Sequence, residues 1–162
     1  QKPLFVEESE STSTRNDALI ELFRRSASSG GGVLLGVQGG RNSEGLDLPG
    51  DLLSTVVVVG VPYARPTPRV TASIDYYESK FPKRGKEYGY NVPALRKAAQ
   101  AAGRAFRSAD DRGVVVFLDH RFASPQCASL LPSWIRQSCK VLPDEDGLIS
   151  RELEQFYGCR IR

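Results

Sequence analysis

Three short apolar runs along the chain have the length and composition of buried β-strands. They are Val33–Val37, Thr55–Val59 and Val114–Leu118. None of them alternates apolar with polar residues, so each is expected to be covered on both faces. That pattern is typical of a parallel sheet packed between helices. A fourth, shorter strand is predicted at Lys2–Val6.

Apolar residues at helical spacing separate these strands. The first helix is expected to be capped by Thr14 or Asn16. Its apolar positions are Ala18, Leu19, Leu22 and Phe23. Further helices are predicted at Arg69–Phe81 and Pro93–Arg107. Strands that alternate with helices indicate an α/β layered domain with a mainly parallel sheet flanked by helices.

The pattern becomes weaker after the third strand. A short helix is expected to start within Leu131–Ile135, and an edge strand is expected at Lys140–Leu142. A last helix is predicted to be capped by Asp146 or Ser150. Its apolar positions are Leu153, Phe156 and Tyr157. Because no internal repeat or second boundary is visible, residues 1–162 are predicted to form a single domain.

The run Asn91–Ser108 combines a small-residue face with a basic one. If it is helical, one face carries Arg96, Gln100, Arg104 and Arg107, and the other carries Leu95, Ala98, Ala102, Ala105 and Phe106. Two arginines one turn apart, preceded by an amide, suit a clamp for an anion such as phosphate. The alternative is a solvated basic helix face.

Composition restricts the other chemistry. The 162 residues carry a formal net charge of +3, which permits a nucleic-acid partner without requiring one. A single histidine, His120, argues against a histidine metal site or a conventional catalytic triad. Cys127, Cys139 and Cys159 have neither zinc nor disulfide spacing, so no metal site is expected. No apolar run reaches the length of a membrane span, and no membrane partner is expected. The absence of any methionine predicts an excised piece of a longer protein.

A phosphate loop is missing from the chain. The Gly85-Lys86 pair is followed by Glu87, so it does not fit the Walker pattern. The acidic run 144–146 does not end an apolar strand and is not expected to hold magnesium. The chain alone is therefore not expected to hydrolyse ATP, although its arginines suit a phosphate site that another domain completes.

Two motifs carry a resemblance to a known family. Gln100-x-x-Gly103-Arg104-x-x-Arg107 matches motif VI of superfamily 2 helicases, and Ser43-Glu44-Gly45-Leu46-Asp47 resembles their motif V in its XPD/DinG form. Similar linking segments are Gly60–Tyr63, Ile74–Tyr77, Tyr88–Tyr90, Asp111–Val116 and Asp119–Phe122. The ordered match runs from Lys2 to Trp134. The chain thus resembles the C-terminal motor domain of XPD-type helicases, closer to archaeal-type XPD than to DinG.

The resemblance implies a RecA-like three-layer domain of an ATP-dependent DNA helicase that moves 5′ to 3′ on single strands. Arg104 and Arg107 would reach the ATP phosphates bound by the first motor domain, and Gln100 would lie near the γ-phosphate or attacking water. The implied nucleotide-binding residues are Gly45, Asp47 and Gly103. The implied DNA-binding residues are Ser43, Glu44, Tyr63 and Arg65.

The same resemblance implies cofactors and partners. ATP and Mg²⁺ would be shared with the first RecA-like domain of the same polypeptide, and an iron–sulfur cluster is expected only in the full-length protein. The expected partners are single-stranded DNA, that first domain and proteins of a repair complex. The domain is expected to lack its own first strand. Its location would be cytoplasmic in a prokaryote, which the archaeal-like sequence favours, or nuclear in a eukaryote.

Two other interpretations stay open. The chain could be a non-catalytic module that binds single-stranded DNA or docks a repair partner. A basic cluster would then serve the module, although it also fits an ordinary solvated loop. Its residues are Lys80, Lys83, Arg84 and Lys86, with Phe81 and Tyr88 among them. The remaining interpretation is an unrelated α/β domain with a chance arginine pair.

Overall fold

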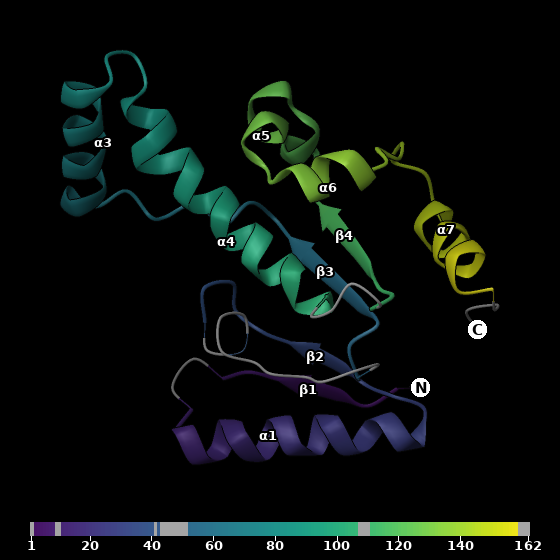
Figure 1. Cartoon of the computed structure of the whole chain (residues 1–162). Coiled ribbons are helices and arrows are strands. Elements are labelled where there is room, and N and C mark those ends of the chain that lie inside the picture. Colours follow the sequence, from purple (N-terminus) through teal and green to yellow (C-terminus); the bar gives the residue numbers. More distant parts are fainter. Residues whose placement is uncertain (1, 9–10, 41, 43–51, 107–110, 159–162) are drawn as a thin grey trace.

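A computed structural model describes residues 2–8, 11–40, 42, 52–106 and 111–158. Helices and strands alternate along much of the chain (Figure 1). In chain order they are β1 (Leu4–Val6), α1 (Ser13–Ser26), β2 (Val33–Leu35), β3 (Thr55–Val59), α3 (Pro68–Lys80), α4 (Val92–Ala102), β4 (Val114–Leu118), α5 (Pro125–Leu130), α6 (Ser133–Ser138) and α7 (Leu148–Tyr157). Shorter turns are η1 (Ala27–Ser29), the π-helical η3 (Glu87–Asn91), η4 (Gly103–Ala105) and η5 (His120–Ala123).

The strands form two parallel pairs. β1 pairs with β2 in the register Leu4–Val33 to Val6–Leu35, and β3 pairs with β4 in the register Thr55–Val114 to Val59–Leu118. Helix α1 connects the first pair, and α3 and α4 connect the second. Parallel strands need such crossover connections. The predicted α/β architecture, with parallel strands flanked by helices, is confirmed.

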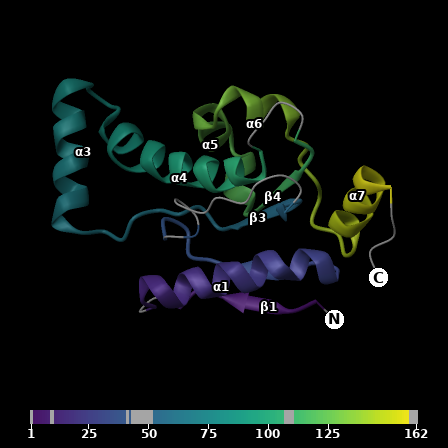
Figure 2. The same ribbon diagram turned by 60° about the horizontal axis from the view of Figure 1, so that its bottom comes forward.

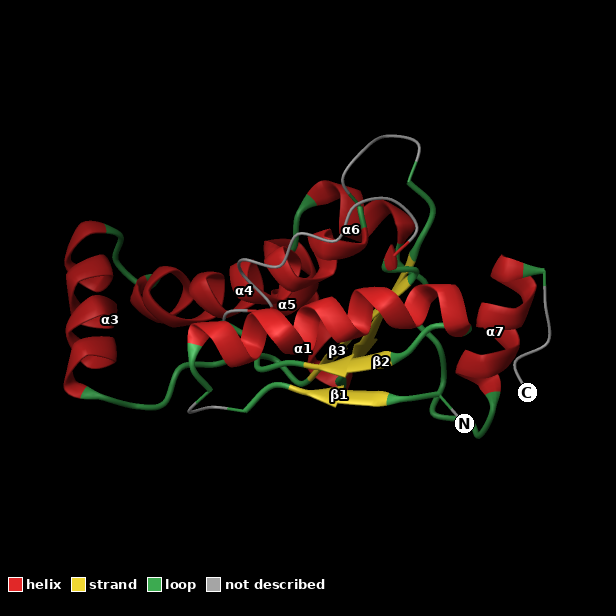
Figure 3. Ribbon diagram, turned by 90° about the horizontal axis from the view of Figure 1, so that it is seen from below, coloured by secondary structure: helices red, strands yellow, loops and turns green. Residues whose placement is uncertain are grey.

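Helix α1 covers one face of the first strand pair (Figure 3). The ring of Phe23 meets that of Phe5 edge to face, with centroids 5.7 Å apart. The helix is capped by Thr12, whose side chain accepts a hydrogen bond from the Arg15 N–H, so the predicted cap at Thr14 or Asn16 was wrong. Asn16 is instead buried one turn inside the helix, in line with Ile20 and Phe23.

Helix α4 forms the centre of the main core. Leu95, Ala98 and Ala102 are fully buried, as their spacing predicted, and they pack in one cluster with Val58 of β3 and Phe122. The helix is shorter than predicted, because it ends at Ala102 and tightens into η4. That turn buries Ala105, whose carbonyl oxygen lies 3.2 Å from the position of a Cβ on Gly113, just before β4.

The strands are not covered on both faces, and this prediction was wrong for the part of the chain that the structure describes. Successive side chains of a strand point to opposite faces. In the first pair, Phe5 and Leu34 lie on one face and are half-buried. On the other face of that pair, Leu4, Val6, Val33 and Leu35 are at least two-fifths exposed. In the second pair, Val57, Val59 and Leu118 are likewise at least two-fifths exposed.

The C-terminal part adds short helices around α4 and β4. Cys127, Leu131 and Ile135 extend the main core. The predicted edge strand at Lys140–Leu142 was wrong, since these residues form neither helix nor strand. Helix α7 is preceded by Gly147 in the left-handed region (φ 75°) rather than by a side-chain cap at Asp146 or Ser150. Within the described ranges, no helix is long and apolar enough to cross a bilayer.

Candidate functional site at the carboxyl ends of the strands

Gln38 joins the two strand pairs at their carboxyl ends, where ligands of open α/β sheets usually bind. Its side-chain amide Nε2 donates to the carbonyl oxygens of Val59, at 2.8 Å, and Gly60, at 3.2 Å. The Gly60 N–H in turn donates to the Leu118 carbonyl at the end of β4, at 3.2 Å. The Gln38 side chain therefore links the segment after β2 to the end of β3, and the Gly60 backbone links the end of β3 to the end of β4.

A tight turn follows β2 and is held by Glu7 at the end of β1. The Glu7 carboxylate Oε2 accepts a hydrogen bond from the Val37 N–H at 2.9 Å, and the Gly40 N–H donates to the Val37 carbonyl at 2.8 Å. A Cβ on Gly40 would lie 2.8 Å from that same carbonyl oxygen. Glycine is therefore required at this turn by backbone packing.

Two buried asparagines fasten the chain after this turn to α1. Asn16 Nδ2 donates to Asn42 Oδ1 at 2.9 Å, and Asn42 Nδ2 donates back to Asn16 Oδ1 at 3.1 Å. Each residue is only 5% exposed. Buried amides are stabilised when both their donor and acceptor groups are paired. The reciprocal pair thus fixes the chain immediately before Ser43.

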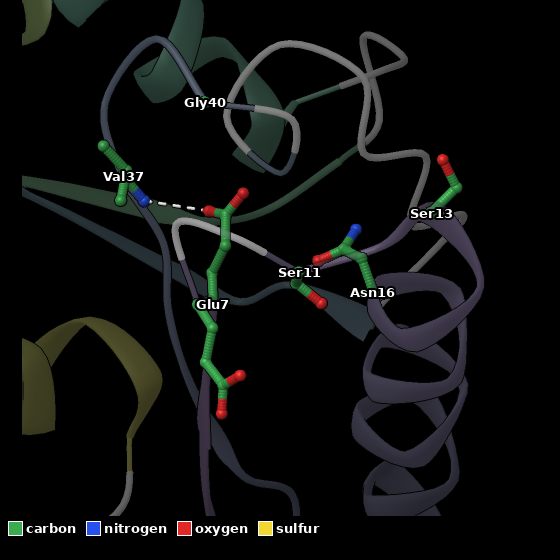
Figure 4. A pocket seen from close by; sticks show the side chains of 7 residues that line it. Glu7, Ser11, Ser13, Asn16, Val37 and Gly40 are labelled. Atoms are coloured by element: carbon green, nitrogen blue, oxygen red, sulfur yellow. Dashed lines mark hydrogen bonds between the residues drawn. The ribbon is translucent and has the colours of Figure 1, made fainter.

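A pocket of about 420 Å³ lies between the end of β1, the start of α1 and the turn after β2 (Figure 4). Its lining residues are Glu7, Glu8, Ser11, Ser13, Asn16, Val37 and Gly40. Glu8 forms an ion pair with Arg15 at 3.1 Å, and Glu7 is engaged by the Val37 N–H. Two carboxylates at its wall make this pocket unsuited to a phosphate group.

The end of α4 brings basic and amide side chains to the same region. Gln100 is exposed on the last turn of α4, and Arg104 is half-buried in η4. Lys97 extends toward the turn after β2, where its Nζ lies 3.5 Å from the position of a Cβ on Gly39. Helix α4 and the turn after β2 are therefore neighbours in space.

Gly103 occupies an open position between Gln100 and Arg104. Its φ of −63° is available to any residue, and a Cβ placed there would meet nothing within 4 Å. Neither backbone conformation nor packing inside the described chain requires glycine here. Among the described residues, nothing occupies the space that a side chain at this position would fill.

Tyr63, in the loop after β3, has partners inside the protein. Its ring stacks on Tyr90 with centroids 5.0 Å apart and planes 11° apart, and the Arg121 guanidinium lies 5.5 Å from its ring centroid. Burial raises the pKa of its hydroxyl, as does the hydrogen bond with the Cys127 thiol. Arg65, two residues later, is exposed. Base stacking by Tyr63 therefore stays a prediction, and it would compete with these contacts.

Asp119 holds Arg121 beside Tyr63. The carboxylate accepts hydrogen bonds from the Arg121 guanidinium and from the Arg121 backbone N–H at 2.9 Å. The guanidinium hydrogen bond is the main reason why the pKa of Asp119 lies well below its usual range. The segment after β4 thus meets the loop after β3 where the Arg121 guanidinium lies over the Tyr63 ring, and that loop meets η3 through the Tyr63–Tyr90 stack.

Five predicted site residues lie outside the described residues: Ser43, Glu44, Gly45, Asp47 and Arg107. The structure brings the turn after β2 and the end of α4 together, and it keeps Tyr63 in a separate cluster with Tyr90. The sequence predictions missed the Asn16–Asn42 pair, Gln38 and Lys97. The position of Asn16, one turn before Ile20 and two before Phe23, was a usable signal for a buried polar residue.

The described residues include no group of three or more histidine, cysteine, aspartate or glutamate side chains that could hold a metal ion. Cys127 is buried in the apolar core, and Cys139 is exposed. This arrangement does not fit an iron–sulfur cluster, which needs several thiolates at one point.

Comparisons with known proteins agree with the fold and the motifs. A family model described as "Helicase C-terminal domain" matches residues 1–138. The chain belongs to this family of helicase C-terminal domains. Within the family it is of the XPD type, as the resemblance predicted, because its relatives include the yeast XPD/RAD3 subunit and a solved XPD helicase.

Several curated relatives are named DNA helicases or helicase subunits. The human "Regulator of telomere elongation helicase 1" is 34% identical over 96% of this chain and 14% of its own length. The *Saccharomyces cerevisiae* "General transcription and DNA repair factor IIH helicase subunit XPD/RAD3" is 34% identical over 83% of this chain and 17% of its own length. "ATP-dependent DNA helicase chl1" of *Aspergillus clavatus* is 29% identical over 99% of this chain and 24% of its own length.

A solved structure named "XPD_Helicase" superimposes with a TM-score of 0.63 and 28% identity, over 86% of this chain and 24% of that chain. The chain thus spans a quarter or less of the length of these proteins. The relatives named above come from human, yeast and *Aspergillus*, and the archaeal-like character stays a prediction.

Proposed function

We propose that residues 1–162 form the second RecA-like motor domain of an ATP-dependent DNA helicase that moves 5′ to 3′ on single strands. In this proposal Arg104 and Arg107 contact the phosphates of ATP held by the first motor domain, and Gln100 contacts the γ-phosphate or the attacking water. Gly103 permits close approach of that nucleotide. The chain alone does not hydrolyse ATP.

The observation that carries the proposal is the end of α4. Gln100 is exposed, Gly103 faces open space, and Arg104 follows directly in the tightened turn. Lys97 of the same helix lies beside the turn after β2. An arginine and an amide beside a glycine that the chain itself does not require suit a surface to which a phosphate is brought from outside.

ATP would supply the phosphoanhydride bond, and Mg²⁺ would supply the charge that binds ATP to the first domain. The described residues of this chain offer cations rather than a metal-binding carboxylate cluster, so they fit the phosphate and not the metal. Arginines supplied across a domain boundary stabilise charge that develops on the transferring phosphate. Ser43, Glu44, Gly45 and Asp47 would couple this cleft to the DNA.

Single-stranded DNA is the proposed substrate, with Tyr63 and Arg65 beside its path. The first RecA-like domain is the obligatory partner, and repair-complex proteins are further proposed partners. Because the relatives named above are eukaryotic, we favour the nuclear location over the cytoplasmic one. Any iron–sulfur cluster would belong to another part of the polypeptide.

The test replaces Arg104 with alanine in the helicase polypeptide that carries this domain. DNA-stimulated ATP turnover should fall about a thousand-fold or more, because the arginine acts mainly in the transition state. ATP binding and the urea unfolding midpoint should change little. The Arg107→Ala variant should behave in the same way.

Arg96→Ala is the matched control, since Arg96 is an exposed arginine on the same helix, two turns before Arg104. It should retain near-normal turnover. Normal turnover in Arg104→Ala and Arg107→Ala would sink the assignment. Equal losses in Arg96→Ala and Arg104→Ala would indicate a general basic surface instead of a specific phosphate contact.

The second candidate function is a non-catalytic module that binds single-stranded DNA or docks a partner. One observation favours a separate binding surface: aromatic and basic side chains are exposed together at the end of α3 and in the loop 81–86 that follows it. This second function would be supported if the Arg104→Ala and Arg107→Ala variants kept both their ATP turnover and their affinity for DNA.

A further inference from the structure

Helix α3, the loop 81–86 and η3 form a hairpin that stands apart from the strands (Figures 1 and 2). No residue of α3 is buried. The arms of the hairpin, α3 and η3, are in close contact at Gly89. A Cβ on Gly89 would lie 2.8 Å from the backbone N and Cα of Ile74. The hairpin is thus closely packed within itself, and α3 has no residue buried against the rest of the described chain.

Four aromatic rings run in contact along the tip of this hairpin. Tyr77 meets Tyr76 at 5.5 Å and Tyr88 at 6.0 Å, and Tyr88 meets Phe81 at 5.2 Å, all edge to face. The two rings at the ends of this row are exposed, Tyr76 by 59% and Phe81 by 50%. Aromatic side chains are normally buried when they serve only packing. The row thus leaves two ring surfaces for an external partner.

The carboxylates near the tip are already engaged. Glu78 accepts hydrogen bonds from the backbone N–H groups of Lys83, at 2.6 Å, and Gly85, at 2.7 Å, and these bonds lower its pKa. Glu87 is paired with Arg84, whose guanidinium also lies 4.7 Å from the Tyr88 ring centroid. The loop is therefore ordered by its own acidic groups.

Apart from Asp75, an exposed carboxylate directly before Tyr76, the remaining charges at the tip are positive. Lys80, Lys83 and Lys86 are exposed, and none has an ion-pair partner among the residues that the structure describes. Lys83 has a φ of 69°, a conformation that the two Glu78 hydrogen bonds help to hold. The side chains of all three lysines are therefore available to bind a polyanion.

We propose that the hairpin tip, defined as Tyr76, Lys80, Phe81, Lys83 and Lys86, binds single-stranded DNA outside the cleft between the motor domains. The lysines contact phosphates, and the rings of Phe81 and Tyr76 stack on unpaired bases. This combination of cations and exposed rings is how single strands are held without sequence preference. The proposal deepens the proposed function and rests on it, because that function supplies DNA as the substrate.

The position of the hairpin is consistent with a continuous strand path. Tyr90, at the root of the hairpin, stacks on Tyr63 in the loop after β3, and its hydroxyl donates to the Ala64 carbonyl at 3.2 Å. The loop that contains Arg65 leads directly into α3. A strand that passes Tyr63 and Arg65 therefore leaves the cleft toward the hairpin. An acidic peptide would use the lysines but has no need of the two rings.

The first experiment measures affinity of the 162-residue chain for a fluorescein-labelled oligo(dT) by anisotropy, without nucleotide, across a range of salt concentrations. The triple variant Lys80→Ala, Lys83→Ala, Lys86→Ala should bind at least about tenfold more weakly, with a salt slope lower by about two, as expected when three phosphate contacts are lost. The matched control removes three other exposed cations, through Arg25→Ala, Arg136→Ala and Arg151→Ala. Its affinity should stay within about twofold.

The second experiment tests the rings. Phe81→Ala and Tyr76→Ala should each weaken binding about fivefold or more, and Phe81→Trp should restore it, because any large ring can stack on a base. Circular dichroism and the urea midpoint identify any variant that fails to fold. Oligo(rU), duplex DNA and poly-glutamate serve as competitors.

Equal losses in the lysine triple variant and its control would overturn the proposal, as would competition by poly-glutamate at the same charge concentration as oligo(dT). Competition by oligo(rU) equal to that by oligo(dT) would retain the site and extend it to single strands of either kind. The outcome is independent of the arginine test, because Arg104→Ala reports ATP turnover whereas these variants report DNA affinity without ATP.

Discussion

Replacement of Asn16 by alanine should destabilise the chain much more than its position on a surface helix indicates. Asn16 and Asn42 exchange two hydrogen bonds, at 2.9 and 3.1 Å, and each is 5% exposed. The variant leaves both the Nδ2 and the Oδ1 of Asn42 buried without their partner. Each unpaired buried group costs about 1–3 kcal/mol, so for the two groups we expect a loss of about 2–6 kcal/mol in the free energy of unfolding.

That loss is a large fraction of the total stability of a chain of this size, about 5–15 kcal/mol. At about 2–4 °C per kcal/mol for a chain of this length, it corresponds to a decrease in Tm of about 4–24 °C. Asp17→Ala is the matched control, since Asp17 is the exposed neighbour of Asn16 on the same helix. Its effect should stay within about 0.5 kcal/mol.

The assay is urea unfolding followed by circular dichroism for Asn16→Ala, Asn42→Ala and the double variant. The double variant removes both buried amides at once, so its loss should be smaller than the sum of the two single losses by about 1–3 kcal/mol. Strictly additive losses would refute the reciprocal pair. A loss in Asn16→Ala no larger than in Asp17→Ala would refute the burial on which the magnitude depends.

Two further predictions concern Asp119 and the glycines. The pKa of Asp119 is lowered in the folded state, so its contribution to stability is present above about pH 5 and is lost as pH falls through and below the normal aspartate range. The Asp119→Asn variant should therefore be less stable than wild type at pH 7. Thermal unfolding at several pH values should show that the difference in stability between the two proteins narrows on acidification. Gly89→Ala should cost about 1–3 kcal/mol, because its Cβ would lie 2.8 Å from the backbone of Ile74, which cannot move aside easily. Gly103→Ala is its control and should leave the Tm unchanged or slightly higher, since the added methyl group meets nothing within 4 Å; a large loss there, or none in Gly89→Ala, would contradict the packing described.

The parts of the fold that sequence could predict are those set by local pattern. The small-residue stripe of α4 identifies the core directly, because Leu95, Ala98 and Ala102 recur at helical spacing and all three are fully buried. The apolar runs at β3 and β4 likewise identify a parallel pair. These features depend on the residues of one segment, so the sequence of that segment is sufficient.

Other features depend on pairs of distant residues and could not be read from one segment. The end of α4 is decided by Ala105, which packs against the chain before β4 and tightens the helix into η4. Exposure of Val57 and Val59 depends on whether a helix covers that face, and valine-rich strands give no signal of it. Asn16 resembles a helix cap until its partner, 26 residues later, is known.

The candidate site follows the same division. Motif spacing predicts which residues belong to the phosphate and DNA surfaces, since a helix turn and a strand end fix their local geometry. It does not predict how the turn after β2, the end of β3 and helix α4 are held together. That depends on Gln38, which links β2 to β3, and on Lys97, which reaches from α4 to Gly39. Both are ordinary polar residues whose neighbours come from other segments, so only the folded chain reveals them. Because these contacts join the turn after β2 to β3 and to α4, substitutions at Gln38 and Lys97 should alter the coupling between ATP turnover and DNA affinity before they alter either one alone.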